Sequence, residues 1–359
     1  PRRKYGMRSL LYIAAAVSLA APALAFSTVA SLPCHPTAKA SGTLRSSRLA
    51  VPALRMSGGT EPKATQTAEE IHNRQWELNM KNFRASWECD MNWYTRSSDA
   101  TTTNQDLWLH IPSEERKDVS YAISFSDEDT GIWDGKGLLF APNGQMKLDL
   151  SRAGYNGGPG SGGNCLQFPG LGGQSAPVMN PTAADISPKC GHEINFFYGR
   201  SRSMIVALWA LDAAGKEPVL RLSSVGIAPF RDGLAEASTR EPKVRTCGRP
   251  GTGLDMVQAF KGWTGVRDVY TRQVKPEGNV VFTPRPVTFD LDSYTKAPAC
   301  HRFTDNLIFA GPEVIDGKGP FELIFGCQPA DNLYKQLTIA FDGSGTLVDW
   351  TLDQFSPNA

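Results

Sequence analysis

Residues 87–96 have the sequence WECDMNWYTR, in which apolar and polar side chains alternate from Trp87 to Trp93. Successive side chains of an extended chain point to opposite faces, so the apolar members share one face and the polar members share the other. The apolar members are Trp87, Cys89, Met91 and Trp93. Alternation of this length predicts a half-buried β-strand in the wall of a barrel or sandwich.

The same pattern occurs a second time in the chain. Six residues separate Trp87 from Tyr94-Thr95-Arg96, and six residues likewise separate Trp263 from Tyr270-Thr271-Arg272. Each copy also follows a hydroxyl residue with an acid three positions later, which is typical of a capped helix start: Thr67 with Glu70, and Thr252 with Asp255. The repeat predicts two modules, each consisting of a short helix, a Trp and a strand.

Composition favours β structure in both modules. Among 359 residues, 34 Gly and 25 Pro separate short apolar runs, as in chains built from strands and turns. The 37 basic residues are balanced by 36 acidic ones, so the chain lacks the basic field of a nucleic-acid binder. No nucleic-acid partner is therefore expected.

The first 59 residues have the pattern of a targeting sequence. Met7, interpreted as the true start, precedes an apolar run and the small-x-small sequence Ala23-Leu24-Ala25, which predicts a signal peptide cleaved after Ala25. Residues 27–59 contain no acidic residue, which is typical of a transit peptide. We expect a bipartite presequence for a complex red-type plastid, with the mature chain in the stroma or at the stromal face of the thylakoid. A secreted protein with an N-terminal linker is the alternative.

The mature chain is predicted to contain two domains and no transmembrane segment. A polar segment at 233–250 is interpreted as a linker between domains at 67–232 and 251–357. In the first domain, short strands are predicted at 107–111, 120–125, 136–140 and 146–150. The Gly-rich stretch 153–189 has no Gly-Lys-Ser/Thr sequence, so it is interpreted as a loop across a barrel mouth and not as a phosphate loop.

A second apolar strand is predicted from Ser203 to Leu211. If it extends back through Gly199, six side chains share one face: Tyr198, Arg200, Arg202, Met204, Val206 and Leu208. Two arginines on a face that becomes apolar need an acidic partner or an exit to water.

Four stretches of the mature chain resemble the DUF3598 family of cyanobacteria and plastids: Gln75 to Trp87, Arg200 to Trp209, Ile227 to Phe230, and Phe321 to Gly345. The resemblance covers residues 70–355. It implies an all-β fold of two tandem lipocalin-like (calycin) antiparallel barrels, each preceded by a short helix. The S-type phycobiliprotein lyases are distant relatives. In calycins the first-strand Trp packs near a basic residue of a late strand, which implies Trp87 with Arg200 or Arg202, and Lys335 as the nearest candidate in the second barrel.

The leading hypothesis is a non-catalytic plastid protein that binds a hydrophobic or tetrapyrrole-like molecule, such as a tetrapyrrole, carotenoid or lipid, in its first barrel. The residues expected to line the site are Trp87, Met91, Trp93, Tyr198, Arg200, Arg202, Met204 and Val206, with an arginine pairing with an anionic group. The alternative is that these side chains only fill the core of a closed barrel and bind no ligand. The other hypotheses are a ligand-free scaffold or peripheral subunit of a thylakoid complex, and a bilin lyase that hands a chromophore to an apoprotein.

No catalytic or metal-binding residues are predicted. The seven cysteines include no C-x-x-C pair, and the proximity in sequence of Cys190 to His192 and of Cys300 to His301 is interpreted as packing. A disulfide between Cys165 and Cys190 is compatible with the sequence but is not established by it.

Overall fold

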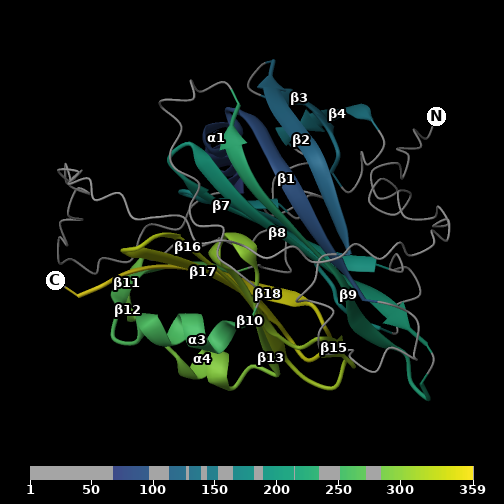
Figure 1. The fold of residues 1–359 in the computed structure, drawn as a ribbon, viewed down its shortest axis with the longest axis vertical. Coiled ribbons are helices and arrows are strands. Elements are labelled where there is room, and N and C mark those ends of the chain that lie inside the picture. Colours follow the sequence, from purple (N-terminus) through teal and green to yellow (C-terminus); the bar gives the residue numbers. More distant parts are fainter. Residues whose placement is uncertain are drawn as a thin grey trace, which may run out of the picture. The chain divides into compact units, whose positions relative to one another are not determined.

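A computed structural model describes residues 68–96, 113–126, 129–138, 144–152, 165–181, 189–213, 215–233, 251–271 and 284–358. The predicted presequence and the strand predicted at 107–111 lie outside these ranges, as does the predicted linker from residue 234 on. The described residues form two antiparallel β-sheets with short helices (Figure 1). The predicted all-β fold is confirmed.

The first sheet contains ten strands in the described part of the chain, in the order β4-β3-β2-β1-β9-β8-β7-β6-β5, with β15 paired to β9. Their bounds are β1 Ser86–Thr95, β2 Glu114–Phe125, β3 Thr130–Lys136, β4 Gln145–Ser151, β5 Cys165–Phe168, β6 Leu171–Ser175, β7 Lys189–Tyr198, β8 Ser201–Asp212, β9 Val219–Asp232 and β15 Val314–Ile315.

The second sheet contains eight strands among the described residues, in the order β10-β13-β14-β16-β17-β18-β11-β12. Their bounds are β10 Gly251–Thr252, β11 Thr264–Thr271, β12 Arg285–Thr288, β13 Ala299–Arg302, β14 Leu307–Gly311, β16 Phe321–Ala330, β17 Leu333–Phe341 and β18 Leu347–Ser356.

Both sheets follow the same order, except that β10 precedes β11 in the chain and pairs with β13. The first strand of each module pairs with the last one, β1 with β9 and β11 with β18. The sheet then continues from neighbour to neighbour in chain order. Within the described residues, β4 does not pair with β5, and β12 does not pair with β10. This shared up-and-down order supports the interpretation of the repeated Trp-x6-Tyr-Thr-Arg sequence as the start of two copies of one module.

A helix precedes the first strand of each module, as predicted. Helix α1 (Ala68–Phe83) leads into β1, and helix α3 (Gly253–Val257) with the 3₁₀ turn η3 (Gln258–Phe260) leads into β11. Glu69 and Glu70 lie in the first turn of α1, where carboxylates interact favourably with the helix dipole. Two further short elements are α4 (Asp292–Thr295) and the 3₁₀ turn η4 (Thr304–Asn306). In the described part of the chain, the helices lack the length and apolar composition needed to cross a bilayer.

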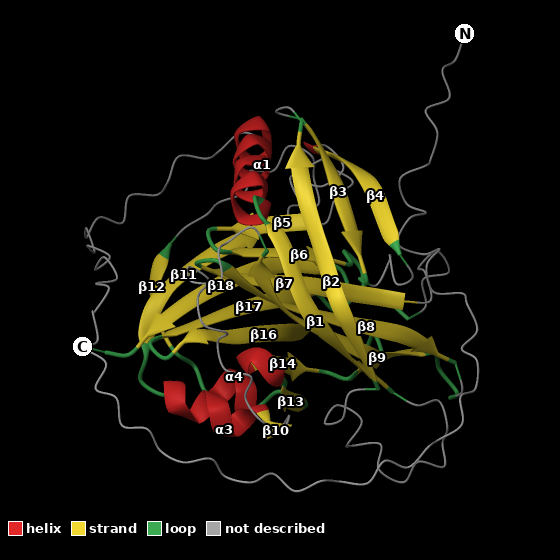
Figure 2. Ribbon diagram, turned by 45° about the horizontal axis from the view of Figure 1, so that its top comes forward, coloured by secondary structure: helices red, strands yellow, loops and turns green. Residues whose placement is uncertain are grey.

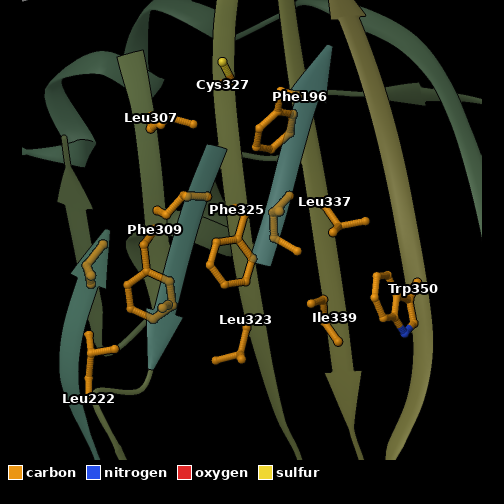
Figure 3. Close-up of a cluster of buried hydrophobic side chains, with 14 of the residues drawn as sticks. Phe196, Leu222, Leu307, Phe309, Leu323, Phe325, Cys327, Leu337, Ile339 and Trp350 are labelled. Carbon is orange, nitrogen blue, oxygen red and sulfur yellow. The ribbon is translucent and has the colours of Figure 1, made fainter. Parts of the chain in front are cut away.

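One hydrophobic core lies between the two sheets (Figure 2, Figure 3). Strands β5–β9 of the first sheet contribute Phe196 and Leu222, and strands β14–β18 of the second contribute Phe325, Leu337 and Trp350. Helices α3 and α4 lie against the other face of the second sheet, over a separate cluster. Strands β8, β14, β16 and β17 are therefore largely buried on both faces, which explains why their sequences are apolar without clear alternation.

The repeated motif of the first module contributes to the contact between the sheets. The Tyr94 ring packs against Phe303, with the ring centroids 5.5 Å apart. Arg96 Nη2 lies 2.6 Å from one Glu313 oxygen, and His301 Nε2 lies 2.7 Å from the other. Burial alone raises the pKa of Glu313, but His301 and Arg96 hold it below its usual value. These polar contacts join β1 to the segment before β15.

Two predictions about the first module were wrong. The strand predicted at 136–140 shares only Lys136 with β3, because the chain turns at Gly137 with a φ of +79°. Residues 139 and 140 of this prediction lie outside the described ranges. The predicted loop at 153–189 contains the buried hairpin of β5 and β6. Its glycines serve close packing: a Cβ at Gly172 would lie 2.4 Å from Gln167 Oε1, and one at Gly173 would lie 3.2 Å from the Trp350 ring.

The turn of this hairpin provides a test of the packing. Gly170 has a φ of +73°, and a Cβ there would lie 2.8 Å from the buried Lys335 Nζ. Gly262 has a φ of +84°, and a Cβ there would meet nothing within 4 Å, so it is a matched control. We expect Gly262→Ala to cost about 1 kcal/mol for the left-handed backbone, and Gly170→Ala to cost about 1–2 kcal/mol more because Lys335 must move. If both variants lose the same free energy of unfolding in urea, the expected crowding of Lys335 by a side chain at position 170 is contradicted.

Candidate ligand-binding site

The inner face of the first sheet, defined as the face turned away from the second sheet, carries its own buried cluster. Six of the eight residues predicted to line a site lie on it: Arg202 and the apolar residues Trp87, Met91, Trp93, Met204 and Val206. Side chains from α1, β2, β3, β7 and β9 complete the cluster: Phe83, Val119, Tyr121, Ile123, Trp133, Phe197, Ala228 and Phe230, with Leu138 and Leu208. The apolar side chains of residues 87–93 therefore share one buried face, as their alternation predicted.

A glycine on β9 allows two of these side chains to pack closely. A Cβ at Gly226 would lie 2.6 Å from Met91 Cε and 3.0 Å from the Trp93 ring. Gly226 pairs with Trp93 on β1 and with Val206 on β8. The missing side chain leaves the space that the two large β1 side chains occupy.

Arg202 lies at the centre of the inner face, enclosed by aromatic rings. Its side chain is fully buried, at 0% exposure. The guanidinium carbon is between 3.9 and 5.9 Å from the centroids of five rings. In order of increasing distance, these rings belong to Phe230, Tyr121, Trp87, Phe83 and Phe197. We call this arrangement the Arg202 cage.

The guanidinium of Arg202 has an unusual electrostatic environment. None of its three nitrogens has a hydrogen-bond partner among the described residues. Burial lowers the pKa of Arg202 well below its usual value, and the nearby Cys89 acts in the opposite direction. Each cation–π contact contributes about 0.5–2 kcal/mol, whereas an unpaired buried charge costs several kcal/mol. The cage therefore offsets part of this cost and leaves the donors without acceptors.

Arg200 and Tyr198 do not belong to this cluster. Strand β7 ends at Tyr198 and β8 begins at Ser201, with a turn at Gly199 where φ is +54°. The predicted continuous strand was therefore wrong, and residues before and after the turn do not share a face by parity. Arg200 is exposed and pairs with Asp232 at 2.8 Å. Of the two predicted arginines, only Arg202 lies on the inner face.

The second module has no arginine at the corresponding place. Tyr334 on β17 stacks against Phe260, which precedes β11 as Phe83 precedes β1, with the centroids 4.2 Å apart. The hydroxyls of Tyr334 and Tyr294 lie 2.6 Å apart, and Tyr294 donates to Gln336 at 2.8 Å. The hydroxyl of Tyr334, the central polar group of the second module, therefore has a hydrogen-bond partner within that module.

Lys335, the predicted basic residue of the second module, faces the first sheet instead. Its Nζ donates to the carbonyl oxygens of Phe197 at 2.7 Å and Gly170 at 3.1 Å. The prediction that it matches Arg202 was wrong, because β17 is buried on both faces and its sequence gives no sign of which face is which. Burial lowers the pKa of Lys335 to about 8.

A surface groove lies beside the cage and shares two of its rings. It has a volume of about 310 Å³ and lies between the C-terminal end of α1 and the β7–β8 turn. Trp87 and Phe197, two rings of the cage, line it together with three cations, Lys81, Arg84 and Arg200, and one anion, Asp232, which pairs with Arg200. We call it the basic groove. Among the described residues, no three His, Cys, Asp or Glu side chains come together as a metal site.

Sequence analysis did not find four rings of the cage. Phe83 and Phe230 belong to stretches that resemble DUF3598, but Tyr121 and Phe197 carried no separate signal. They meet Arg202 through the pairing of β8 with β7 and β9 and of β1 with β2. Registers between strands far apart in sequence are not visible in a single sequence. The disulfide considered for Cys165 is absent, since its thiol is free.

Comparison with solved structures identifies the fold. A DUF3598 protein of unknown function from Nostoc punctiforme superposes with a TM-score of 0.53 at 14% identity, covering 79% of this chain and 99% of that one. This chain has the fold of that DUF3598 protein. A putative outer membrane protein from Bacteroides fragilis matches with a TM-score of only 0.17 at 6% identity, over 77% of this chain and 98% of that one, which is too low to support any argument. No protein-family model and no curated protein matches the chain significantly. The similarity to S-type lyases stays a prediction.

The position of Lys335 leads to a prediction about pH. Its folded pKa of about 8 lies below the usual 10.5, so between these values the unfolded chain holds a proton that the folded chain has lost. Stability therefore rises with pH in this window. Relative to Lys335→Met, the wild type is expected to gain about 2 kcal/mol between pH 8 and 10 in urea unfolding. The exposed Lys261→Met variant is the control. A wild-type advantage that does not change with pH would contradict the assignment.

Proposed function

We propose that the protein binds, without transforming it, a hydrophobic small molecule that carries an anionic group, and that the Arg202 cage holds the anionic end. The observation that carries the proposal is the fully buried guanidinium without a hydrogen-bond partner among the described residues. A planar guanidinium matches a carboxylate with two parallel hydrogen bonds. Binding of such a group removes the cost of the unpaired charge, so this cost favours the bound state.

The surroundings support a ligand with an apolar body. The guanidinium lies among aromatic rings, and the basic groove beside it combines Trp87 and Phe197 with three cations. Its volume of about 310 Å³ is at the lower end for small-molecule sites, so it accommodates one end of a larger molecule. A tetrapyrrole propionate and a lipid carboxylate both fit this description. A carotenoid without an acidic group matches only the rings.

The second module supports a single site in the first. Tyr334 takes the central position there and is hydrogen-bonded to Tyr294, so that module carries no comparable orphan donor at this place. We infer that it acts as a packed companion that covers the outer face of β7–β9. This division of roles also argues against two equivalent ligands.

Replacement of Arg202 tests the proposal. Arg202→Met keeps the length and apolar character of the side chain but removes every donor. Loss of a charge-assisted hydrogen-bond pair is worth about 1.5–3 kcal/mol, so we expect at least tenfold lower ligand occupancy. The ligand-free variant should be more stable than the wild type, because a buried unpaired charge is gone. The measurements are mass spectrometry and absorbance of the natively purified protein, together with thermal unfolding.

Arg221→Met is the matched control, since Arg221 is a β9 arginine that pairs with Asp212 at 2.9 Å and lies outside the cage and the basic groove. It should retain full occupancy. A stable Arg202→Met protein with full occupancy contradicts the anionic anchor. A colourless, lipid-free wild-type protein that co-migrates with a photosynthetic complex supports the scaffold hypothesis instead, and covalent transfer of a bilin to an apoprotein supports the lyase hypothesis.

We also propose a plastid location, supported by the sequence of residues 1–59 alone. The signal-type apolar run and the acid-free stretch that follows it have the composition of a bipartite presequence. A fluorescent protein fused behind residues 1–59 is expected to enter the plastid of an alga with red-type plastids. Cleavage after Ala25 would leave Phe26 as the first residue of the transit part, so replacing Phe26 by Ala tests that part. Export of both fusions to the medium would favour the secreted alternative.

A further inference from the structure

Strand β4 forms one edge of the first sheet (Figure 2). It pairs with β3 on one side and, in the described part of the chain, with no strand on the other. Its seven residues, Gln145–Ser151, include no Pro or Gly and pair with β3 in one constant register without a bulge. An edge of this kind presents a row of backbone N–H and C=O groups that can pair with a strand of another chain.

The other three sheet edges among the described residues are protected. On β5, the side chain of Gln75 on α1 accepts a hydrogen bond from the backbone N–H of Gln167 at 2.6 Å and donates one to its carbonyl oxygen at 2.9 Å. In the second sheet, β10 has only two residues, and β12 has four, of which Pro286 lacks an N–H. Short strands, Pro and covering helices are means by which sheets avoid edge pairing. The contrast marks β4 as the edge that is available to a partner.

The inner-face side chains of β4 are apolar and incompletely covered. Leu148 pairs with Trp133 on β3, so Met146, Leu148 and Leu150 share the inner face. Leu148 and Leu150 are half-buried at the rim of the inner-face cluster, and Met146 is 36% exposed. A strand added beside β4 would cover all three side chains, and their burial would favour association.

The charges on the other face of β4 fit a second copy of the same strand. Lys147 and Asp149 are both exposed. Two copies related by a two-fold axis pair antiparallel, and each face of the sheet stays on its own side, so the axis passes through a residue position. With the axis at Leu148, Lys147 of each copy lies opposite Asp149 of the other. With the axis at Lys147 or at Asp149, like charges lie opposite each other, which is unfavourable.

A charge row across the joined sheets would alternate in sign. Lys147 already pairs with Asp134 on β3, with Nζ 3.1 Å from the carboxylate oxygen. In the pairing centred on Leu148, Asp149 of the second copy lies on the other side of the same ammonium. A Lys on an edge strand ordinarily discourages pairing with another strand. Here the partner strand supplies the opposite charge at the matching position, which argues for an identical copy as the partner.

We propose that the β4 edge is a self-association surface, on which two copies of this chain pair their β4 strands antiparallel about a two-fold axis at Leu148. The two first sheets become one continuous sheet with both inner faces on the same side. The contact uses the same edge of each copy, so association stops at the dimer. An interface of this size is smaller than the roughly 1,000 Å² of a stable one, so we expect a reversible dimer with a dissociation constant on the order of micromolar.

Charge reversal on β4 tests the proposal by sedimentation of the full chain at concentrations from about 1 to about 200 μM. The wild type is expected to change from monomer to dimer in this range. Lys147→Asp and Asp149→Lys should each weaken the dimer at least about tenfold, because each places like charges opposite each other at two symmetry-related positions. An equimolar mixture of the two variants should recover a dimer, since the two acids of one chain then face the two bases of the other.

The control is Glu322→Lys, the same charge reversal at an exposed strand acid of the second sheet, which should associate like the wild type. Asp149→Lys leaves the pair of Lys147 with Asp134 in place, so it remains a test if Lys147→Asp does not fold. A wild type that is monomeric at the highest concentration overturns the proposal, as does a dimer that a folded Asp149→Lys variant retains. Two folded variants that fail to associate when mixed overturn it as well. No ligand is needed for these measurements, so they do not depend on the proposed binding function.

Discussion

Strand β8 is buried on both faces, and this constraint fixes the fold and the candidate site together. One face places Ile205, Ala207 and Trp209 in the core between the sheets, and the other places Met204 and Val206 on the inner face. A slip of one residue would exchange the two faces and move Arg202 into the core between the sheets. The second sheet thus holds the register that puts a cation among five rings. Without that sheet, the outer face of β7–β9 would be an exposed apolar surface.

The two modules show what a shared architecture leaves free to change. Both have a helix that ends in Phe, a Trp, a first strand that pairs with the last, and a central inner-face position on a late strand. At that position the second module has Tyr334, whose hydroxyl is paired within the module, and the first has Arg202, whose donors are not. The architecture tolerates either side chain. An orphan cation is therefore a property of this sequence and not a consequence of the fold.

Local patterns predicted the strands well, and they failed where the outcome depends on long-range pairing. The alternation from Trp87 to Trp93 placed four side chains correctly, because that strand has one buried face along this stretch. The apolar pattern around β8 did not show that the chain turns at Gly199, after the end of β7. A glycine in a turn and a glycine in a strand look alike in a single sequence. Lys335 was assigned to the wrong face because β17 is buried on both faces, which removes the period of two. The rings around Arg202 could not be predicted, because their meeting depends on registers between distant strands.

An arginine buried with a fixed carboxylate partner would have been satisfied permanently, as Arg267 is by Asp353 in the second module at 2.6 Å. Arg202 has no such partner among the described residues, and two of the rings that enclose it, Trp87 and Phe197, also line the basic groove. Burial of a cation with unpaired donors is costly, and an acceptor from outside the chain would remove that cost. The two arginines therefore differ in what the proposed function asks of a ligand: the Arg267–Asp353 pair needs none, whereas the Arg202 cage calls for an anionic group.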